Sequence, residues 1–571
     1  MNKIKKLREI FESFAVDGYL VPKNDEYFNE YVSESNDRLK FISNFSGSAG
    51  FAIILKNRNY LFVDGRYTVQ GRIQSGKQFN IITIPHKFPK DVLKFKKKIV
   101  IGFDPKLHNE KQLNFFFNIQ NIILKPISKN LIDIVWPKKP KDLVKPFFSL
   151  AKKDTGESSE KKISKVKNII LKNRVNYLLV TAPENVAWIL NIRGYDSTFS
   201  PIPNSRLLID SKGNIKFFSK NEKIVKIKKN FSKKIEFHKE YAIERKLKSL
   251  RKKNIWIDSL SCSIHFKNLL MGNNKIIEKI DPIYFLKSIK NSTEIKNMQK
   301  SHVIDGAALT KFLFWIKKNF KSKKITEISA SKKLLDFRKK NKKFKSSSFP
   351  TISGSGSNGA IIHYKPEKKT NRKLRKGDIY LVDSGGQYEF GTTDVTRTIS
   401  LNNNDRRVKN IFTRVLKGHI AVANYKLKEK SSGSKIDLEA RKYLKEIGLN
   451  YSHGTGHGVG FFLNVHEGPQ SISKNNKVPL KKGMILSNEP GFYLKNQYGI
   501  RIENLIYIDE FKNKLIFKNL TYSPIDCDLI NFKMLTTKEK DYLFEYHLSV
   551  YSKISKYLNK KEKKWLVSLI Q

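Results

Sequence analysis

Short apolar runs separated by helix-compatible polar stretches fill the first 135 residues. Residues 19–21 (YLV), 52–55 (AIIL) and 60–63 (YLFV) have the length and composition of buried strands. Strands that alternate with helices predict an α/β domain over residues 1–135. Residues 136–140 (WPKKP) contain two prolines and are expected to form a linker.

A second stretch, over residues 150–285, repeats this order of elements. A helical pattern near residues 160–173 leads into an apolar strand at 177–180. Residues 188–194 (WILNIRG) then take the place that 41–47 (FISNFSG) occupy in the first stretch. We therefore predict two related α/β domains. Chance similarity between two small α/β units is the alternative, and these residues alone leave it open.

From residue 287 onward the pattern changes to one long helix followed by glycine-rich strands and turns. The apolar residues that predict the helix over 294–320 are Ile295, Met298, Ala307, Leu309, Phe312 and Leu313. We expect a third domain over 287–510. In the tail, residues 511–571, a helix is expected to begin near Thr537 and to pack on that domain. The predicted fold class is thus α/β (α+β).

Four acidic residues stand at strand ends or turns in the third domain: Asp383, Asp394, Glu489 and Glu503. Asp383 ends an apolar strand, and a hairpin after it would bring Asp394 close. Glu503 is expected to share a strand face with Arg501, two residues before it. Carboxylates gathered in one place repel each other unless cations neutralise them.

Four carboxylates and one histidine suit two divalent ions about 3.5–4 Å apart, bridged by carboxylate oxygens and a hydroxide. Oxygen-rich donors favour Mn²⁺ over a thiolate zinc site. The alternative is that lysines pair each acid separately, and composition alone leaves both readings open. The histidines favour the metal. His453 and His457 lie in residues 451–460, where four glycines exclude a zinc-binding helix, and His363 and His466 lie beside similar turns.

Residues 354–359 (GSGSNG) match the dinucleotide-binding pattern G-x-G-x-x-G. That motif must follow a strand and open a helix. Here Pro350 precedes it, and the apolar residues 360–366 after it predict a strand. A nucleotide site is therefore not expected.

Charge and cysteine content restrict the class of protein. The 571 residues carry a formal net charge of +59 and only two cysteines. A positive charge this large raises the possibility of nucleic-acid binding. The lysines, however, are scattered along the chain, so nucleic acid is not the expected partner. Few cysteines fit a reducing cytoplasm. The chain shows neither a secretory signal pattern nor an apolar run long enough for a membrane span.

The motifs resemble the creatinase/aminopeptidase P family of pita-bread metalloenzymes. The segments that carry the resemblance in the third domain are 358–364, 383–397, 453–460, 488–491 and 499–504. Residues 44–50, 64–67 and 188–194, with 545–547 in the tail, resemble the long three-domain form of the family. The resemblance implies two creatinase-like N-terminal domains, 1–135 and 150–285. A pita-bread catalytic domain, 287–510, and the extension 511–571 would follow.

The family resemblance also implies a role for each site residue. The implied metal ligands are Asp383, Asp394, His457, Glu489 and Glu503, with Asp394 and Glu503 bridging two ions, most simply Mn²⁺. Glu489 would also be the general base and proton shuttle. Three histidines, His363, His453 and His466, would contact the substrate and the tetrahedral intermediate. Arg66 would bind substrate from the first domain, either of the same chain or of a partner subunit.

The implied activity is hydrolysis of the N-terminal Xaa-Pro bond of peptides by a metal-bridging hydroxide, in a cytoplasmic homodimer. Because that bond has no N–H, the site needs a shaped apolar wall to select proline. The candidates for this wall are His363, His466, Tyr364, Phe461 and Phe462. The alternative is that the aromatic residues belong to the hydrophobic core. A dipeptide-only prolidase is the closest alternative. Creatinase, methionine aminopeptidase and a non-catalytic pita-bread binding protein are further ones.

Overall fold

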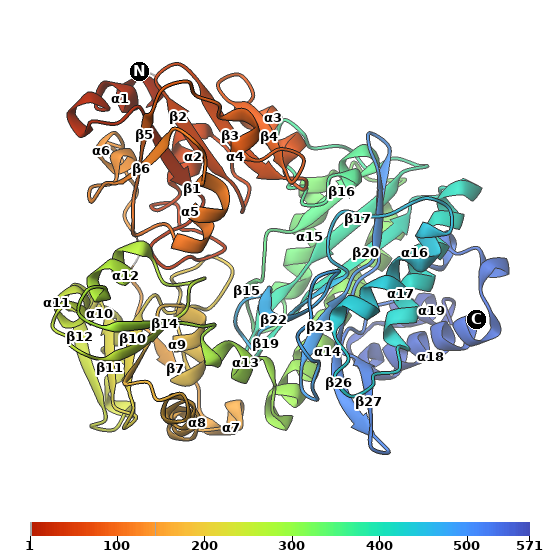
Figure 1. Ribbon diagram of the computed structural model, residues 1–571. Helices are drawn as coiled ribbons and strands as arrows, with labels where there is room; N and C mark the ends of the chain where they lie inside the picture. The colour runs from red at the N-terminus through yellow and green to blue at the C-terminus, as the bar shows by residue number, and fades with distance from the viewer. Residues whose placement is uncertain (1–2, 143, 571) are drawn as a thin grey trace. The chain divides into compact units, whose positions relative to one another are not determined.

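The computed structural model describes residues 3–142 and 144–570, and the chain forms two compact units (Figure 1). One unit runs up to Ala151 and resumes over Glu157–Tyr284, and the other comprises Lys152–Gly156 and the chain from Phe285 onward. No helix among the described residues is long and apolar enough to cross a membrane. The expected linker at 136–140 has no helix or strand, although Trp136 stacks on Phe41 with ring centroids 4.4 Å apart.

The first unit contains two six-stranded sheets of identical topology, ordered β4-β3-β2-β1-β5-β6 and β12-β11-β10-β8-β13-β14. In each, three central strands pair antiparallel and the outer strands join them in parallel. The first sheet comprises β1 Gly18–Pro22, β2 Phe51–Leu55, β3 Asn59–Asp64, β4 Asn80–Ile84, β5 Ile99–Phe103 and β6 Ile122–Pro126. The second comprises β8 Tyr177–Val180, β10 Arg206–Asp210, β11 Ile215–Ser219, β12 Ile235–Lys239, β13 Asn254–Ile257 and β14 Lys275–Glu278. The predicted pair of related α/β domains is confirmed.

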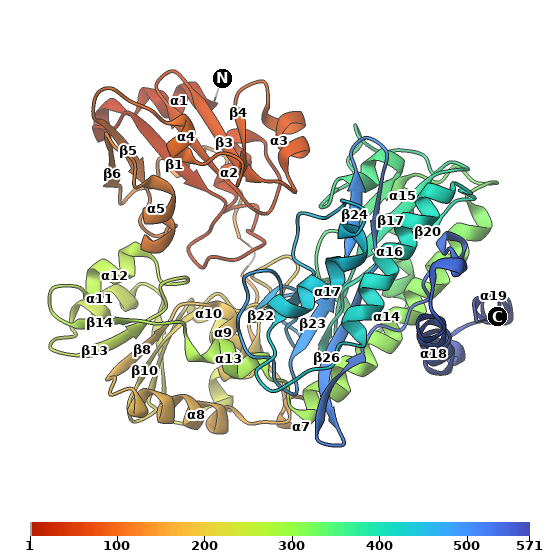
Figure 2. The ribbon, with the colours of Figure 1, turned by 45° about the vertical axis from the view of Figure 1, so that its right-hand side comes forward.

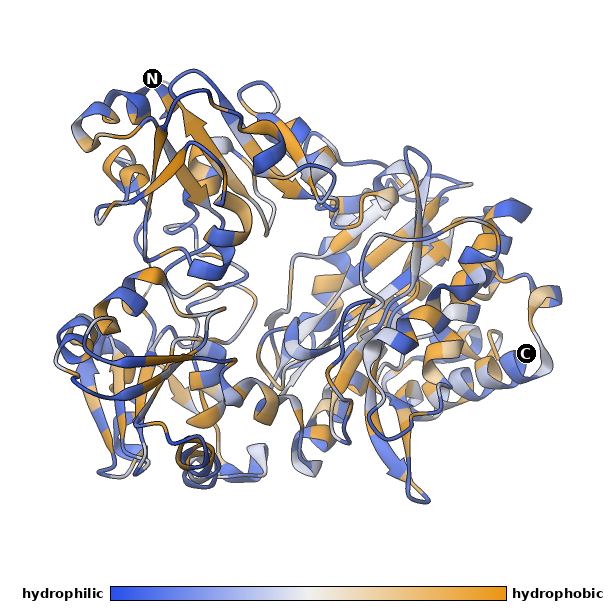
Figure 3. Ribbon diagram, viewed as in Figure 1, coloured by the Kyte–Doolittle hydropathy of each residue, from blue (hydrophilic) through white to orange (hydrophobic). Residues whose placement is uncertain are grey.

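Helices follow and flank the strands of both sheets. In the first half these are α1 Lys3–Glu9, α2 Arg38–Ser43, α3 Thr68–Ser75, α4 Pro89–Val92, α5 Glu110–Phe117 and α6 Leu131–Ile134. In the second half they are α8 Ser159–Lys172, α9 Pro183–Ile189, α10 Asn221–Ile224, α11 Ala242–Lys248 and α12 Ile264–Leu270. Figure 3 shows hydrophobic residues concentrated in the strands and hydrophilic ones in the connections, which is the pattern that predicted buried strands. The short β7 (Phe148–Ser149) pairs with β9 (Ile192–Arg193).

The second unit begins with α14, Ser292–Asn319, which matches the predicted helix to within two residues. A capping box fixes its start: the Asn291 side chain accepts from the N–H of Glu294, and the Glu294 carboxylate accepts from the N–H of Asn291. The other helices of this unit are α7 Lys152–Thr155, α15 Glu327–Lys339, α16 Arg406–Ala423, α17 Gly433–Lys445, α18 Thr537–Ile554 and α19 Lys560–Val567. Helix α13, Pro282–Ser288, carries the chain from the first unit into the second.

Antiparallel sheets occupy the middle of the second unit. The strands are β15 Phe344–Ser347, β16 Ile352–Ser355, β17 Ile379–Ser384, β18 Gly386–Tyr388, β19 Gly391–Thr392, β20 Val395–Ser400, β21 Gly456–Gly458, β22 Glu467–Ile472, β23 Ile485–Asn488, β24 Gly491–Leu494, β25 Tyr498–Arg501, β26 Asn504–Phe511 and β27 Lys514–Asn519. They form sheets ordered β15-β18-β19, β16-β17-β20, β22-β21-β23-β26-β27 and β24-β25.

Helices cover both faces of the five-stranded sheet. Alternate residues point to opposite faces of a strand, so Leu486 and Ile506 pack with α16 and α17, whereas Ile485 and Leu505 pack with Met298 of α14. Helices α16 and α17 lie side by side, as Figure 2 shows. The same alternation applies to β17: Tyr380 and Val382 pack with α14 and α15 on one face. The other face is left for Asp383.

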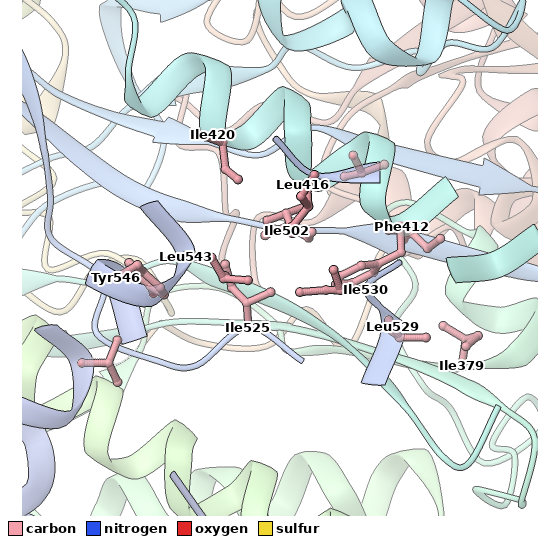
Figure 4. Close-up of a cluster of buried hydrophobic side chains, with 14 of the residues drawn as sticks. Ile379, Phe412, Leu416, Ile420, Ile502, Ile525, Leu529, Ile530, Leu543 and Tyr546 are labelled. Atoms are coloured by element: carbon pink, nitrogen blue, oxygen red, sulfur yellow. The ribbon is translucent and has the colours of Figure 1, made fainter. Parts of the chain in front are cut away.

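The C-terminal tail packs on the same unit, as predicted. Figure 4 shows Phe412, Leu416 and Ile420 of α16 in one buried cluster with Leu543 and Tyr546 of α18. The cluster also includes Ile502, which lies beside the acidic residue Glu503. The hydrophobic core of the second unit therefore supports the segment that carries part of the candidate site.

Candidate metal centre

Two antiparallel strands place the first pair of acidic residues. Strand β17 carries Asp383, which lies opposite Thr396 of β20. The short hairpin of β18 and β19 returns the chain, so that Asp394 lies immediately before β20. Both aspartates are buried. The hairpin expected from the sequence is confirmed.

The glycine-rich segment 451–460 forms a strand at its centre and no helix, as its glycines predicted. A Cβ on Gly456 would lie 1.9 Å from the carbonyl oxygen of Ser487, and one on Gly458 would lie 2.3 Å from that of Glu467. Only glycine allows the backbones to approach this closely. His457 stands between these two glycines, on the strand β21.

The imidazole of His457 has a fixed orientation. Its Nδ1 lies 2.8 Å from the carbonyl oxygen of Gly458, an arrangement that places the proton on Nδ1 and leaves Nε2 as the lone-pair nitrogen. Nε2 lies 3.5 Å from Asp394 Oδ2 and 3.5 Å from Glu489 Oε1. These separations are long for hydrogen bonds. They suit ligands that share one ion, because two atoms each about 2.1 Å from a metal lie about 3–3.5 Å apart.

Glu489 follows directly after β23. Its backbone N–H donates to the carbonyl oxygen of Thr455 at 2.8 Å, and the Ser487 hydroxyl donates to its Oε1 at 3.0 Å. Two hydrogen bonds thus hold the backbone and the carboxylate of Glu489 in place, beside His457.

Glu503 lies in the break between β25 and β26, so the expectation that it shares a strand with Arg501 was wrong. The strand ends at Arg501 because the chain there leaves β24 and begins to pair with β23. Both residues still face the acidic cluster. Thr396 Oγ1 donates to Glu503 Oε2 at 2.7 Å, and Arg501 Nη2 lies 2.7 Å from Asp383 Oδ2.

The five predicted ligands gather in one place. One potential ligand atom from each of Asp394, His457 and Glu503 lies within 4.8 Å of the others. Asp383 and Glu489 adjoin this group, since their charges act on each other and on Asp394.

Three acidic residues of the cluster have pKa values above their ordinary values. Burial, together with the charges of Asp394 and Glu489, raises the pKa of Asp383 to about 7 although Arg501 lowers it. Burial and like charges also raise the pKa of Glu489 and, more strongly, that of Glu503. Burial lowers the pKa of His457, but the neighbouring Asp394 and Glu489 raise it to about 9 overall.

These residues fit a pair of divalent cations. The Arg501 guanidinium contacts Asp383 Oδ2, and Arg397 Nη1 donates to the backbone carbonyl oxygen of Glu503 at 2.6 Å. Oδ1 of Asp383 is buried with no hydrogen-bond partner among the described residues, and a cation would satisfy it. The donor set, four carboxylates and one imidazole, is that of hard divalent metals.

Of the three further histidines predicted at the site, His453 and His466 border this cluster. The rings of His466 and His457 meet edge to face with centroids 4.4 Å apart. His453 Nε2 lies 2.9 Å from the Tyr493 hydroxyl, which also accepts from Arg501 Nη1 at 2.6 Å. Tyr493 therefore joins His453 to the arginine of the site, a connection that the sequence did not indicate.

His363 is half-buried in a turn, and the strand predicted over residues 360–366 was wrong. The chain forms the 3₁₀ helix η3, Gly356–Ala360, and then a turn. The reason is a buried carboxylate that the sequence analysis missed. Glu327 accepts hydrogen bonds from the Asn358 amide at 3.0 Å and from the Tyr364 hydroxyl at 2.8 Å, and from two backbone N–H groups.

The aromatic candidates for a proline-binding wall are buried. Tyr364 is 5% exposed and its hydroxyl contacts Glu327, so it belongs to the scaffold. Phe461 is part of a core cluster with Met298, and Phe462 is also buried. Arg66 lies in the first unit, where its guanidinium contacts Asp64 at 2.7 and 3.0 Å.

The glycine pattern 354–359 has a packing role in this structure. Strand β16 precedes it, but only the five-residue 3₁₀ helix η3 follows, whereas a dinucleotide site needs a helix. A Cβ on Gly499 would lie 1.8 Å from the carbonyl oxygen of Gly359. The glycines thus let the loop that carries His363 lie directly against β25, which carries Arg501.

Replacing Gly499 with alanine is expected to destabilise the second unit by about 2–3 kcal/mol, because the new methyl group would force two backbone segments apart. The melting temperature should fall by about 5–10 °C in differential scanning calorimetry. Gly65→Ala is the control, since no heavy atom lies within 4 Å of a Cβ there. Equal melting temperatures for Gly499→Ala and the parent would show that the close approach is not needed.

The fold and the donor set together define a metal-dependent hydrolase. Comparison with known proteins gives the family. Residues 296–510 match metallopeptidase family M24, and residues 513–571 match the C-terminal region of peptidase M24. Residues 3–124 and 138–294 each match a Creatinase/Prolidase N-terminal domain.

Relatives match over the full length. Xaa-Pro aminopeptidase 1 of Dictyostelium discoideum is 36% identical, over 100% of this chain and 96% of its own length. The crystal structure of X-prolyl aminopeptidase from Caenorhabditis elegans matches with a TM-score of 0.92 and 31% sequence identity. The match covers 100% of this chain and 99% of the Caenorhabditis elegans chain, which is described as a cytosolic enzyme with a di-nuclear active site. The prolidase of Pyrococcus horikoshii, at 25% identity and a TM-score of 0.53, covers 64% of this chain and 99% of its own. The chain therefore belongs to metallopeptidase family M24, and the resemblance found in the sequence is confirmed.

Proposed function

We propose that this protein is an Xaa-Pro aminopeptidase that removes the residue before proline from the N-terminus of peptides. The observation that carries the proposal is the cluster of His457 with two buried carboxylates, Asp394 and Glu503, in a chain that matches X-prolyl aminopeptidases from end to end. The prolidase of Pyrococcus horikoshii, which represents the closest alternative, leaves about a third of the chain unmatched.

The proposal assigns two divalent ions, with Mn²⁺ as the preferred metal, to Asp383, Asp394, His457, Glu489 and Glu503. Of these, Asp394 and Glu503 would hold both ions, as the family resemblance implies. The proposed domain limits are 1–135, 150–285, 287–510 and 511–571, with the metal site in the third. The proposed location is the cytoplasm, in line with the description of the Caenorhabditis elegans relative.

When bound, the two ions would supply a water of lowered pKa and a Lewis acid for the carbonyl group before proline. Glu489 acts as the general base and then as the proton donor. The Ser487 hydroxyl holds its carboxylate, and burial raises the pKa of that carboxyl above its ordinary value. The proline nitrogen leaves only once it is protonated, so this second transfer is essential.

The histidines contact the substrate. We assign to His466, which packs against His457, and to His453, which contacts Tyr493, a role in stabilising the oxyanion that develops on the attacked carbonyl. His363 lies on the loop fixed by Glu327 and contacts the substrate chain. We assign to Arg66 a substrate-binding role from the first N-terminal domain, either of the same chain or of a partner subunit.

A kinetic comparison of three peptides tests the activity. With Mn²⁺ present, an Arg-Pro-Pro-type peptide should lose its first residue, and the corresponding Xaa-Ala peptide should react at least about 100-fold more slowly, because the site is shaped for an amide without an N–H. The Xaa-Pro dipeptide separates the alternatives. Cleavage of the dipeptide without cleavage of the longer peptide would make the protein a prolidase.

We also propose that the protein is a homodimer. The first unit holds two domains that contain none of the proposed metal ligands, and such domains often build interfaces or control access. Multi-angle light scattering should give twice the chain mass of 66.3 kDa. A fully active species of 66.3 kDa would contradict this proposal.

A further inference from the structure

A buried cluster of three charges lies next to the candidate site. Glu467 contacts Lys287 Nζ at 3.1 Å and also pairs with Lys290. The side chains of Lys287, Lys290 and Glu467 are 2%, 0% and 2% exposed. Burial raises the pKa of the Glu467 carboxyl, but the two ammonium groups outweigh it, and that pKa is lowered overall. Burying three charged groups is costly, so the cluster calls for a functional reason.

The carboxylate end of this cluster adjoins the metal centre through the backbone. Glu467 is the first residue of β22 and lies opposite Gly458 of β21, the residue after His457. His466 lies in the bend directly before this strand. Its ring meets that of His457, with centroids 4.4 Å apart, while the Glu467 carboxylate contacts the lysines.

The lysine end of the cluster is also anchored. The backbone N–H of Lys290 donates to the carbonyl oxygen of Gly483 at 2.9 Å, and Ile289 forms a β-bridge with Met484. A Cβ on Gly483 would lie 2.4 Å from the carbonyl oxygen of Lys290, so the two segments are in close contact. Met484 leads directly into β23, the strand that ends before Glu489. Lys290 is thus anchored to the segment that leads into the strand just before Glu489, the proposed base.

We propose that Glu467 is a positioning residue: by pairing with Lys287 and Lys290, it holds His466 against His457 in the orientation that the reaction requires. The inference rests on the proposed function, in which His466 contacts the substrate. A hydrogen bond alone would fix Glu467 less firmly. Charge-assisted pairs to two immobile ammonium groups restrict both carboxylate oxygens, and with them the backbone of the neighbouring histidine.

The test is Glu467→Gln, which keeps the size of the side chain and removes its charge. In the metal-loaded full-length enzyme, kcat on the Arg-Pro-Pro-type peptide should fall about 10–100-fold, the range found for residues that orient the groups of a metal site. KM should change less than about threefold, and the metal content per chain should stay the same. A kcat within twofold of the parent would overturn the proposal.

Two further variants separate positioning from stability. Asp526→Asn removes the charge of another buried carboxylate, which lies 2.7 and 2.8 Å from Lys317 and accepts a hydrogen bond from the N–H of Ser400 at 2.7 Å. It should lower the melting temperature and leave kcat within about twofold. In Glu467→Gln/Lys290→Met one buried ammonium is removed as well, so stability should recover in part while kcat stays low. Recovery of kcat together with stability would show that Glu467 acts only on folding, and would overturn the proposal.

A crystal structure of metal-loaded Glu467→Gln gives a readout that does not depend on activity. The His466 ring should leave its edge-to-face position against His457. If the parent enzyme does not cleave Xaa-Pro peptides but the ring moves in the variant, the proposed function fails and the positioning role stands. A ring that keeps its place in the variant overturns the positioning role whatever the activity.

Discussion

Glu503→Gln is expected to lower kcat/KM at least about 1000-fold, equivalent to about 4 kcal/mol of transition-state stabilisation, and at the same time to stabilise the metal-free protein. The activity is lost because an amide neither bridges two cations nor neutralises them as a carboxylate does. Metal analysis should show fewer than two ions per chain. An enzyme that keeps full activity with less than one ion per chain would contradict the dinuclear scheme.

The gain in stability follows from the pKa of Glu503, which burial and the neighbouring carboxylates raise well above its ordinary value of 4.5. An acid with a raised pKa in the folded state destabilises the fold as pH increases above the pKa of the unfolded chain. Glutamine carries no such penalty. Metal-free Glu503→Gln should therefore melt at least about 2 °C above the metal-free parent at pH 8, with the difference disappearing near pH 4.

Glu510→Gln provides the matched control. Glu510 lies on β26, seven positions further along, and is exposed beside Lys482 at 3.2 Å. The same chemical change there should alter kcat/KM less than about twofold, because exposed ion pairs contribute little. Its metal-free melting temperature should equal that of the parent at both pH values. A stability gain in Glu510→Gln equal to that in Glu503→Gln would mean that net charge, and not the site, is responsible.

Addition of Mn²⁺ to the metal-free protein is expected to raise its melting temperature by about 5–10 °C at pH 8.5 and by much less at pH 5.5. The pKa shifts of the acidic residues determine the direction of this pH dependence. The folded-state pKa of Asp383 is about 7 against an ordinary value of 3.8, and those of Glu489 and Glu503 are raised too. The folded protein therefore binds more protons than the unfolded chain, and its stability falls as pH rises from about 4 to 7.

His457 acts in the same direction at higher pH. Its folded-state pKa of about 9 lies above the ordinary value of 6.5, so its contribution to stability is complete below pH 6.5 and is lost as pH rises through 9. Metal binding requires ionised carboxylates and a neutral imidazole, and hence releases protons and strengthens with pH. Calorimetry in two buffers of different ionisation enthalpy should show this proton release. A melting-temperature increase that is independent of pH would place the metal elsewhere.

Sequence pattern predicted those parts of the fold whose structure depends on nearby residues. The helix α14 could be predicted because its apolar spacing and its capping residues lie within the segment itself. The repeat of the first unit could be predicted because each half has its own strands. The loop that carries His363 could not, since Glu327, a residue 31 positions before Asn358, determines its conformation through side-chain hydrogen bonds.

The residue types of the candidate site could be predicted from the sequence, but the contacts that hold these residues in place could be predicted only in part. Carboxylates at strand ends and histidines between glycines indicated a metal centre, and the family resemblance supplied the individual roles. The partners of these residues were not predictable. Lys290 and Glu467 are 177 positions apart, and no local pattern connects them. The break between Arg501 and Glu503 depends on a change of neighbouring strand, which the residues between them do not indicate.

Chemical labelling of Lys287 and Lys290 can report local opening of the structure. Amine-reactive reagents modify exposed lysines readily, whereas Lys287 and Lys290, at 2% and 0% exposure, can react only when the structure around them opens. Most lysines of this chain are exposed, so protection at these two positions can be read in a mass spectrum and compared with that of another buried lysine, Lys162. Their labelling rate measures how often the region beside His466 opens, and it requires neither an engineered probe nor a substrate.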